Sequence, residues 1–299
     1  YLTDQDQSYY LYQLTMDGRS QTGIVACCSI DDYVNGVIKK HENTREEKEQ
    51  DRTRHVDVMN AQTGPIFLAY RQNEALGQIM EQVMAEKPLY DFVSEDGIGH
   101  RVWKVRQAEQ NQNIEAVFAQ VPATYIADGH HRAASAVKVG FMRREANPDY
   151  TGEEEFNYFL SVLFPDDQLM IMDYNRAVKD LNGMSKEDFL AKVCEIFDVS
   201  EIEHAAGQSE EQLRPKQKGE YSMFLGEKWY LCRLKEADKN PDPVKGLDVS
   251  LLQDLLLDPV LGIKDPKTDD RIDFIGGIRG LKELERRVHT DCAVAFAMY

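Results

Sequence analysis

The sequence predicts an α+β fold in two domains. The expected strands and helices follow one another irregularly, and short turns join several neighbouring strands into antiparallel hairpins. A length of 299 residues corresponds to about two domains, and 42% hydrophobic residues are sufficient for a core. Proline, glycine and acidic residues concentrate at 147–155. We therefore expect a first domain at 1–150 and a second α+β domain at 151–299 that completes a cleft.

The strands and helices of the first domain are expected in the order in which their patterns occur. Strands are predicted at 9–15, 23–30, 65–70, 90–93, 101–105 and 123–127. The dipeptides Asp17-Gly18 and Asp96-Gly97 are typical turns of hairpins. Helices are predicted from Thr44, where Glu47 completes a capping box, and at 73–86 and 133–139.

The second domain shows the same mixture of elements. Strands are predicted at 158–164, 169–174, 222–225, 229–234 and 271–275. Helices are predicted at 185–197, with Ser185 as the N-cap, and at 247–257 and 281–287. This irregular order favours an α+β arrangement over a doubly wound parallel sheet.

Charge and hydropathy exclude several classes of protein. The chain has 52 acidic and 35 basic residues, a net charge of −17 that would repel a phosphate backbone, so nucleic acid is not an expected partner. No stretch approaches the ~18 apolar residues of a membrane-spanning helix, so a membrane is not expected either. The chain begins with Tyr1, has no signal peptide and ends in an apolar stretch, and we interpret it as an internal portion of a longer protein.

The cysteines show no metal-binding spacing. They are Cys27, Cys28, Cys194, Cys232 and Cys292. Cys27 and Cys28 would point to opposite faces of a strand and are therefore poor disulfide partners. Reduced thiols are expected, which favours a cytoplasmic protein.

The strongest local motif is Asp128-Gly129-His130-His131-Arg132, between a predicted strand and an alanine-rich helix. Unpaired backbone N–H groups and the helix dipole would attract an anion there, and Gly129 would let a phosphate approach closely. Arg132 could bind two oxygens, and the histidines add donors. In the alternative interpretation Asp128 is only an N-cap and the histidines line a crevice. A zinc site is disfavoured because adjacent histidines do not share a helix face.

Two further motifs have both a functional and a structural interpretation. In Lys39-Lys40-His41-Glu42 the glutamate could act as a general base toward a hydroxyl group, but 39–54 could equally be a solvated helix with salt bridges. The segment G-G-I-R-G at 276–280 lacks the order of a dinucleotide-binding or Walker loop. It is either a structural turn or a ligand contact.

Longer strings resemble the bacterial domain-of-unknown-function 1015 family. They are I-K-K-H-E-N-T-R-E-E-K-E-Q-D-R at 38–52, T-G-P-I-F-L-A-Y at 63–70, Y-I-A-D-G-H-H-R-A-A-S-A at 125–136, M-D-Y-N-R at 172–176 and R-I-D-F-I-G-G-I-R-G at 271–280. The resemblance implies a ParB/sulfiredoxin-like fold, in which the loop ending in His-Arg binds nucleotide phosphates.

Two of the motifs are also similar to the archaeal free serine kinase, which phosphorylates L-serine with ADP. Asp128–Arg132 (D-G-H-H-R) matches its loop without change, and Lys40-His41-Glu42 matches its Pro-His-Glu loop with lysine in place of proline. The similarity implies that Glu42 is catalytic, with His41 beside it.

These observations together predict a nucleotide-dependent small-molecule kinase. The loop Asp128–Arg132 would hold the transferred phosphate of ATP or ADP, and Mg²⁺ would bridge phosphate oxygens with Asp128 as a protein ligand. Glu42 would deprotonate the acceptor hydroxyl, and free L-serine, giving O-phosphoserine, is the leading acceptor. The alternatives are a ParB-like nucleotide-binding regulatory module without kinase activity and a loop that is retained only as a scaffold.

Overall fold

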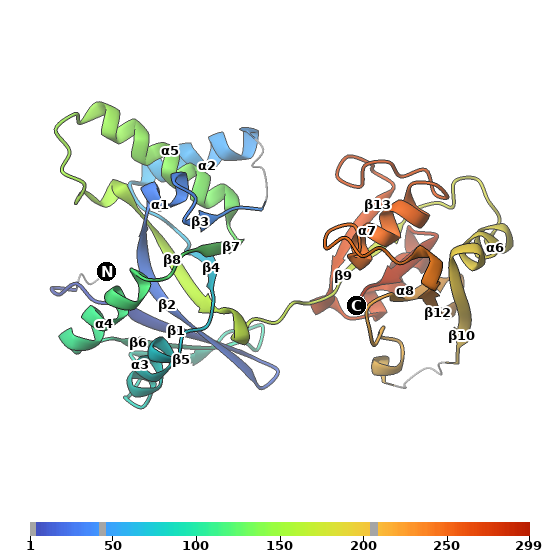
Figure 1. Cartoon of the computed structure of the whole chain (residues 1–299), viewed down its shortest axis with the longest axis horizontal. Helices are drawn as coiled ribbons and strands as arrows, with labels where there is room; N and C mark the ends of the chain where they lie inside the picture. Colours follow the sequence, from blue (N-terminus) through green and yellow to red (C-terminus); the bar gives the residue numbers. More distant parts are fainter. Residues whose placement is uncertain (1–3, 42–45, 204–208) are drawn as a thin grey trace. The chain divides into compact units, whose positions relative to one another are not determined.

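The computed structural model describes residues 4–41, 46–203 and 209–299 and confirms a mixed α+β chain. It divides into two compact units, Tyr1–Met170 and Ile171–Tyr299 (Figure 1). The units separate after Met170 rather than at residue 150. The reason is that β8 (Tyr158–Pro165) pairs with β2 and β4 of the first sheet, so the segment 147–155 is a connection inside the first unit.

The first unit contains an eight-stranded sheet in the order β3-β7-β4-β8-β2-β1-β6-β5. The pairs β3–β7 and β4–β8 are parallel, and the remaining pairs are antiparallel. Besides β8, the strands are β1 (Tyr10–Met16), β2 (Arg19–Ser29), β3 (Ile38–Lys39), β4 (Ile66–Tyr70), β5 (Tyr90–Val93), β6 (Gly99–Lys104) and β7 (Thr124–Asp128).

Helices α3, α4 and α5 contribute to a single core on one face of this sheet. The helices of the unit are α1 (Ile30–Val34), α2 (Glu46–Met59), α3 (Glu74–Met84), α4 (Ala108–Phe118) and α5 (His130–Ala146), with 3₁₀ turns at Glu155–Asn157 and Asp166–Gln168. Four consecutive strands of the sheet contribute buried side chains to this core, namely Leu68 of β4, Leu163 of β8, Ile24 of β2 and Leu11 of β1. Figure 1 shows α2 and α5 side by side, and they pack against each other.

The turn and capping residues of the first unit form the local structures that the sequence predicts. Asp17 and Gly18 both have positive φ, 52° and 77°, which is the geometry of a type I′ turn between β1 and β2. Asn73 caps α3 by accepting hydrogen bonds from the backbone N–H groups of Ala75 and Leu76. The hairpin at Asp17-Gly18 and the helix after Asn73 are thus confirmed.

The second unit contains a six-stranded sheet in the order β10-β12-β11-β14-β9-β13. Its strands are β9 (Tyr174–Val178), β10 (Phe197–Ile202), β11 (Glu220–Leu225), β12 (Lys228–Leu234), β13 (Ile272–Gly276) and β14 (Val294–Ala297). Its helices are α6 (Lys186–Ile196), α7 (Asp248–Leu252) and α8 (Lys282–Thr290), with a π turn at Gln253–Leu257 and 3₁₀ turns at Glu210–Gln212, Glu236–Asp238 and Gly277–Arg279.

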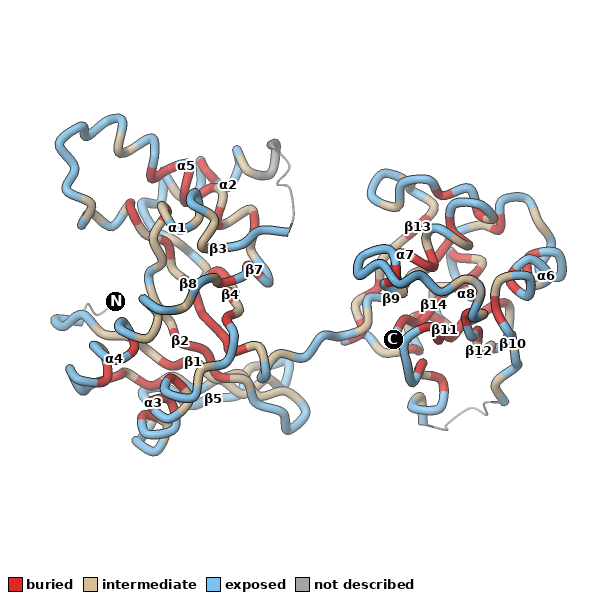
Figure 2. The backbone as a smooth tube through the Cα atoms, viewed as in Figure 1, coloured by how far each residue is buried: buried red, intermediate tan, exposed pale blue. Residues whose placement is uncertain are grey.

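The adjacent strands β11 and β14 of this sheet are buried along their whole length, and therefore on both faces (Figure 2). Side chains alternate along each strand, so Met223 and Phe296 join a core with α6 and α7. Phe224 and Ala295 join a separate core with α8 on the other face.

The strand predicted at 169–174 is wrong, because 169–173 pair with no strand and β9 begins only at Tyr174. The apolar residues there do not enter a core; Ile171 is 97% exposed. Strands β3, β10 and β14 and helices α1 and α4 were not predicted. No helix among the described residues is long and apolar enough to cross a membrane.

Candidate functional site

The Asp128 motif forms a corner between β7 and α5. Asp128 is the last residue of β7, and Gly129, with φ 96° and ψ 27°, is the N-cap of a helix that begins at His130. The alternative in which Asp128 itself is the N-cap is therefore wrong. The N-cap, Gly129, has no side chain with which to cap the helix, so the first turn presents backbone N–H groups and the positive end of the helix dipole.

Arg132 folds back over the corner. Its Nη2 donates a hydrogen bond to Oδ2 of Asp128 at 2.6 Å. A Cβ atom at position 129 would lie 2.9 Å from this Nη2, and one at position 64 would lie 3.6 Å from Nη1. Gly129 is thus required both by its positive φ and by the guanidinium lying against it. The result is a cation held over a helix N-terminus, an arrangement suited to an oxyanion.

His41 meets this corner from a distant part of the sequence. The ring centroids of His41 and His130 are 4.4 Å apart, with the ring planes almost perpendicular. The contact follows from topology, because β3 and β7 are parallel neighbours and the chain leaves both strands at the same edge of the sheet. His130 is buried and His41 is exposed, so the pair runs from the core to the surface.

Helix α5 is held against helix α2 by side chains that follow its first turn. The Ser135 hydroxyl lies 2.7 Å from the carbonyl oxygen of His131 and 3.2 Å from that of Glu49 in α2. Lys138 pairs with the Glu49 carboxylate at 3.5 Å. Among the described residues, Nδ1 of His131 and Nε of Arg132 are buried without a hydrogen-bond partner. Buried polar atoms are normally paired, so these two atoms are available to a bound group.

The segment that precedes α2 is only partly described. Lys40 places its ammonium group 4.1 Å from the ring centroid of Tyr33, so it stabilises the loop through a cation–π contact. Glu42, the predicted general base, and Thr44, the predicted helix start, lie outside the described residues. The described part of α2 begins at Glu46.

Asp128, the predicted magnesium ligand, keeps one carboxylate oxygen free of Arg132. Asp128 is exposed and uses Oδ2 toward Arg132, which leaves Oδ1 for a cation. Within the described ranges, no three His, Cys, Asp or Glu side chains gather in a metal-binding group. A single carboxylate still fits Mg²⁺, which commonly keeps waters and binds substrate phosphates.

The second glycine-rich corner, at 276–280, is filled by the protein itself. The N–H of Gly277 donates to the carbonyl oxygen of Asp173 at 2.7 Å, and a Cβ atom at 277 would lie 2.9 Å from that oxygen. The Glu210 carboxylate accepts a hydrogen bond from the N–H of Leu281 at 2.8 Å. These contacts support the structural interpretation of 276–280.

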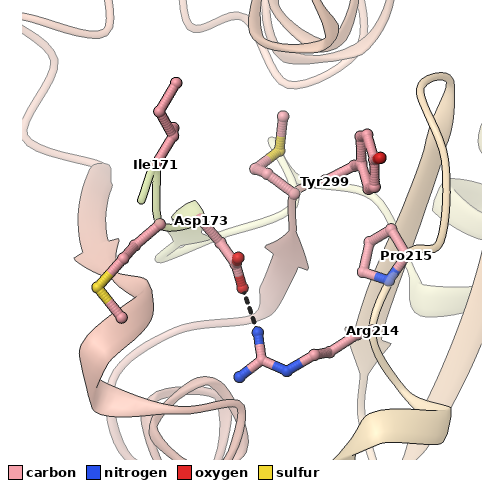
Figure 3. Close-up of a pocket in the computed structure, with 7 residues that line it drawn as sticks. Ile171, Asp173, Arg214, Pro215 and Tyr299 are labelled. Atoms are coloured by element: carbon pink, nitrogen blue, oxygen red, sulfur yellow. Dashed lines mark hydrogen bonds and ion pairs between the residues drawn. The ribbon is translucent and has the colours of Figure 1, made fainter. Parts of the chain in front are cut away.

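Each unit also has a pocket that sequence reasoning missed. In the first unit a pocket of about 210 Å³ lies beside Tyr125 and the Arg71–Asp166 ion pair. In the second unit a pocket of about 440 Å³ contains the Asp173–Arg214 ion pair, 2.6 Å long (Figure 3). Neither could be found from a motif, because each is lined by residues distant in sequence.

The fold and the corner define a two-unit α+β protein with a strand–glycine–helix site. The chain belongs to the family described as Protein of unknown function (DUF1015), whose profile matches residues 1–250. The resemblance found in the sequence is therefore confirmed. A comparison with curated proteins found no significant match.

A comparison with solved structures also found matches, each with low sequence identity and a low TM-score. A free serine kinase in complex with AMP is 15% identical, with a TM-score of 0.35, over 91% of this chain and 76% of that one. A conserved hypothetical protein from Pyrococcus furiosus is 15% identical, with a TM-score of 0.33, over 91% and 78% of the two chains. SbnI with a C-terminal truncation, from Staphylococcus aureus, is 10% identical, with a TM-score of 0.35, over 91% and 82%.

Proposed function

We propose that the protein is a nucleotide-dependent phosphotransferase that phosphorylates the hydroxyl group of a small molecule, with free L-serine as the leading acceptor. The observation that carries the proposal is the contact between His41 and His130. This contact places His41, which precedes the predicted base Glu42 in the sequence, beside the corner that is suited to a phosphate. Phosphoryl transfer needs such proximity, because the protein mainly positions the reactants and neutralises charge.

The corner at Asp128 supplies the donor side of the site. The backbone N–H groups at the start of α5 and the guanidinium of Arg132 bind the phosphates of ATP or ADP. His131 adds a donor through the buried ring atom that has no partner within the described structure. Asp128 would hold Mg²⁺, which neutralises phosphate charge when bound.

The segment at His41 and Glu42 supplies the acceptor side. Glu42 accepts the proton of the substrate hydroxyl while the hydroxyl oxygen attacks the terminal phosphorus atom of the nucleotide. The bond from phosphorus to the leaving nucleotide oxygen breaks, and Arg132 offsets the charge that develops. His41 is a positioning residue that fixes the start of this segment against His130.

The test is a direct assay of the purified protein. Incubation with Mg²⁺, with either ATP or ADP and with a set of hydroxyl amino acids is expected to yield a phosphorylated amino acid, detected by mass spectrometry. The nucleotide and the acceptor that support turnover identify the substrates. Saturable nucleotide binding without product from any acceptor would instead favour a ParB-like regulatory module. Absence of nucleotide binding would mean that the corner is only a scaffold.

A further inference from the structure

Two sequence motifs outside the proposed active site meet on one face of the second sheet. Tyr174 and Arg176 lie on β9, and Phe274 lies opposite Arg176 on β13 (Figure 1). The rings of Tyr174 and Phe274 are stacked, with centroids 5.3 Å apart and planes inclined by 18°. The Cζ atom of Arg176 lies 5.4 Å from the Tyr174 centroid and 4.8 Å from that of Phe274. The three side chains form what we call the Arg176 cluster.

Arg176 differs from the other arginines of its unit. Arg214, Arg233, Arg271, Arg279, Arg286 and Arg287 each pair with at least one carboxylate. Among the described residues Arg176 has no carboxylate partner; its Nη1 donates to the carbonyl oxygen of Tyr174. In a chain with a net charge of −17, an arginine without a carboxylate stands out.

The alternation of side chains along the strands explains why no neighbouring acid neutralises it. Asp273 neighbours Phe274 on β13 and therefore belongs to the opposite face of the sheet, and Asp173 precedes β9 and is engaged by another arginine. Asp173 pairs with Arg214 and Asp273 pairs with Arg287, each at 2.6 Å. Within the described ranges, the face of Arg176 therefore keeps a cation that is paired with no carboxylate.

The cluster remains cationic at neutral pH. Removal from water lowers the pKa of Arg176 to about 10, since the aromatic rings replace solvent without providing a counter-charge. The guanidinium is nevertheless accessible, because Arg176 is only partly buried and Tyr174 is 54% exposed. A partly desolvated guanidinium binds planar or tetrahedral oxyanions more strongly than a fully hydrated one.

We infer that the second unit carries an oxyanion-binding site centred on Arg176, at which the guanidinium takes a phosphate or carboxylate group and the ring of Tyr174 borders the ligand. The site goes beyond the proposed kinase function, since it uses none of the residues of the Asp128 corner. Phosphate and carboxylate share the bidentate geometry that a guanidinium recognises. The experiment distinguishes them.

The full chain, labelled with ¹⁵N-arginine, is titrated with inorganic phosphate and separately with acetate, with sodium chloride at equal ionic strength as the control. The Nε–Hε resonance of Arg176 is assigned by its loss in Arg176→Lys. It is expected to shift saturably with phosphate, with acetate, or with both, and the probe that acts identifies the anion. A resonance that responds only as it does to chloride would overturn the inference.

Calorimetry in an Arg132→Ala background provides a second measurement that excludes the Asp128 corner. Arg176→Met, which keeps an unbranched apolar stem and removes the charged guanidinium, is expected to weaken binding of the active probe about ten- to hundredfold. The affinity of Arg176→Lys for the probe should lie between those of the parent and Arg176→Met, because lysine keeps the charge and loses the bidentate donor geometry of the guanidinium. Arg286→Met, the same change of charge on α8, should bind like the parent. Equal binding by Arg176→Met and the parent would also contradict the proposal.

Discussion

Two corners of the molecule share the order strand, glycine, helix but differ in what surrounds the start of the helix. The first passes from β7 through Gly129, with φ 96°, into α5, and the second passes from β13 to α8 through a segment that ends at Gly280, with φ 70°. At the second corner, Glu210 places a carboxylate on the N–H of Leu281. At the first, the N-cap has no side chain and Arg132 lies over it.

The difference teaches what decides whether such a corner can bind a ligand. Both helices present unpaired N–H groups and a positive dipole end, so both attract an anion. At α8 the chain provides that anion itself through Glu210. At α5 the Asp128 carboxylate is bound to Arg132, and the N-cap, Gly129, has no side chain with which to cap the helix. We therefore expect only the first corner to respond to a phosphate ligand.

The largest expected effect concerns the segment beside the first corner. Glu42→Gln keeps the shape of the side chain and removes its charge, so turnover should fall about 100-fold or more while nucleotide affinity stays close to that of the parent. His131→Ala should instead raise the nucleotide dissociation constant and also slow the reaction. Steady-state phosphorylation and calorimetric nucleotide titration measure the two quantities. Near-parental phosphorylation by Glu42→Gln would contradict the catalytic role of Glu42 and favour the interpretation of 39–54 as a solvated helix with salt bridges.

A matched pair of arginine variants compares the two corners directly. Arg132→Ala should weaken nucleotide binding by about 1.5–3 kcal/mol, because a charge-assisted hydrogen bond is lost. Arg279→Ala removes an arginine of the second corner that is 66% exposed and 3.8 Å from Glu283, and it should leave nucleotide affinity unchanged. Equal losses in the two variants would contradict the distinction between the corners.

Alanine variants of Gly129 and Gly280 should separate an effect on stability from an effect on nucleotide binding. Alanine at position 129 is forced into a left-handed conformation (φ 96°, ψ 27°), and alanine at 280 into an extended positive-φ conformation (φ 70°, ψ 176°) that is normally restricted to glycine. Each should cost about 1–3 kcal/mol in the free energy of unfolding. Only Gly129→Ala should also weaken nucleotide binding, because its Cβ displaces the guanidinium of Arg132. Urea unfolding and nucleotide titration of both variants test this. If Gly280→Ala impaired nucleotide binding as much, the second corner would have to be reassigned.

The smallest expected effect is at the filled corner. Glu210→Ala removes the carboxylate that caps the start of α8 and should cost about 1 kcal/mol, as for other caps. Hydrogen–deuterium exchange should become faster in peptides that cover α8, while peptides that cover α5 should exchange at the parental rate. Unchanged protection of α8 would indicate that Glu210 does not stabilise this helix.

Much of the local structure could be predicted because its causes are local. Ser185 caps α6 by accepting from the N–H of Asp188, and Gly226, with φ 66°, turns the β11–β12 hairpin. The Asp128 motif was likewise placed correctly between a strand and a helix, although the helix starts at His130 rather than at 133. Turns, caps and amphipathic faces depend on neighbours in sequence, so a single sequence contains their signals.

Sequence alone determined the α+β class, the hairpins, the capped helices and the family to which the chain belongs. Tertiary structure alone decided that β8 joins the first sheet, that His41 reaches His130, and that Glu210 fills one corner while the other stays open. These outcomes depend on pairing between segments far apart in the chain. Such pairing depends on the burial of complete faces of sheets and helices. The free energy of that burial is distributed over many residues, so no single motif determines it.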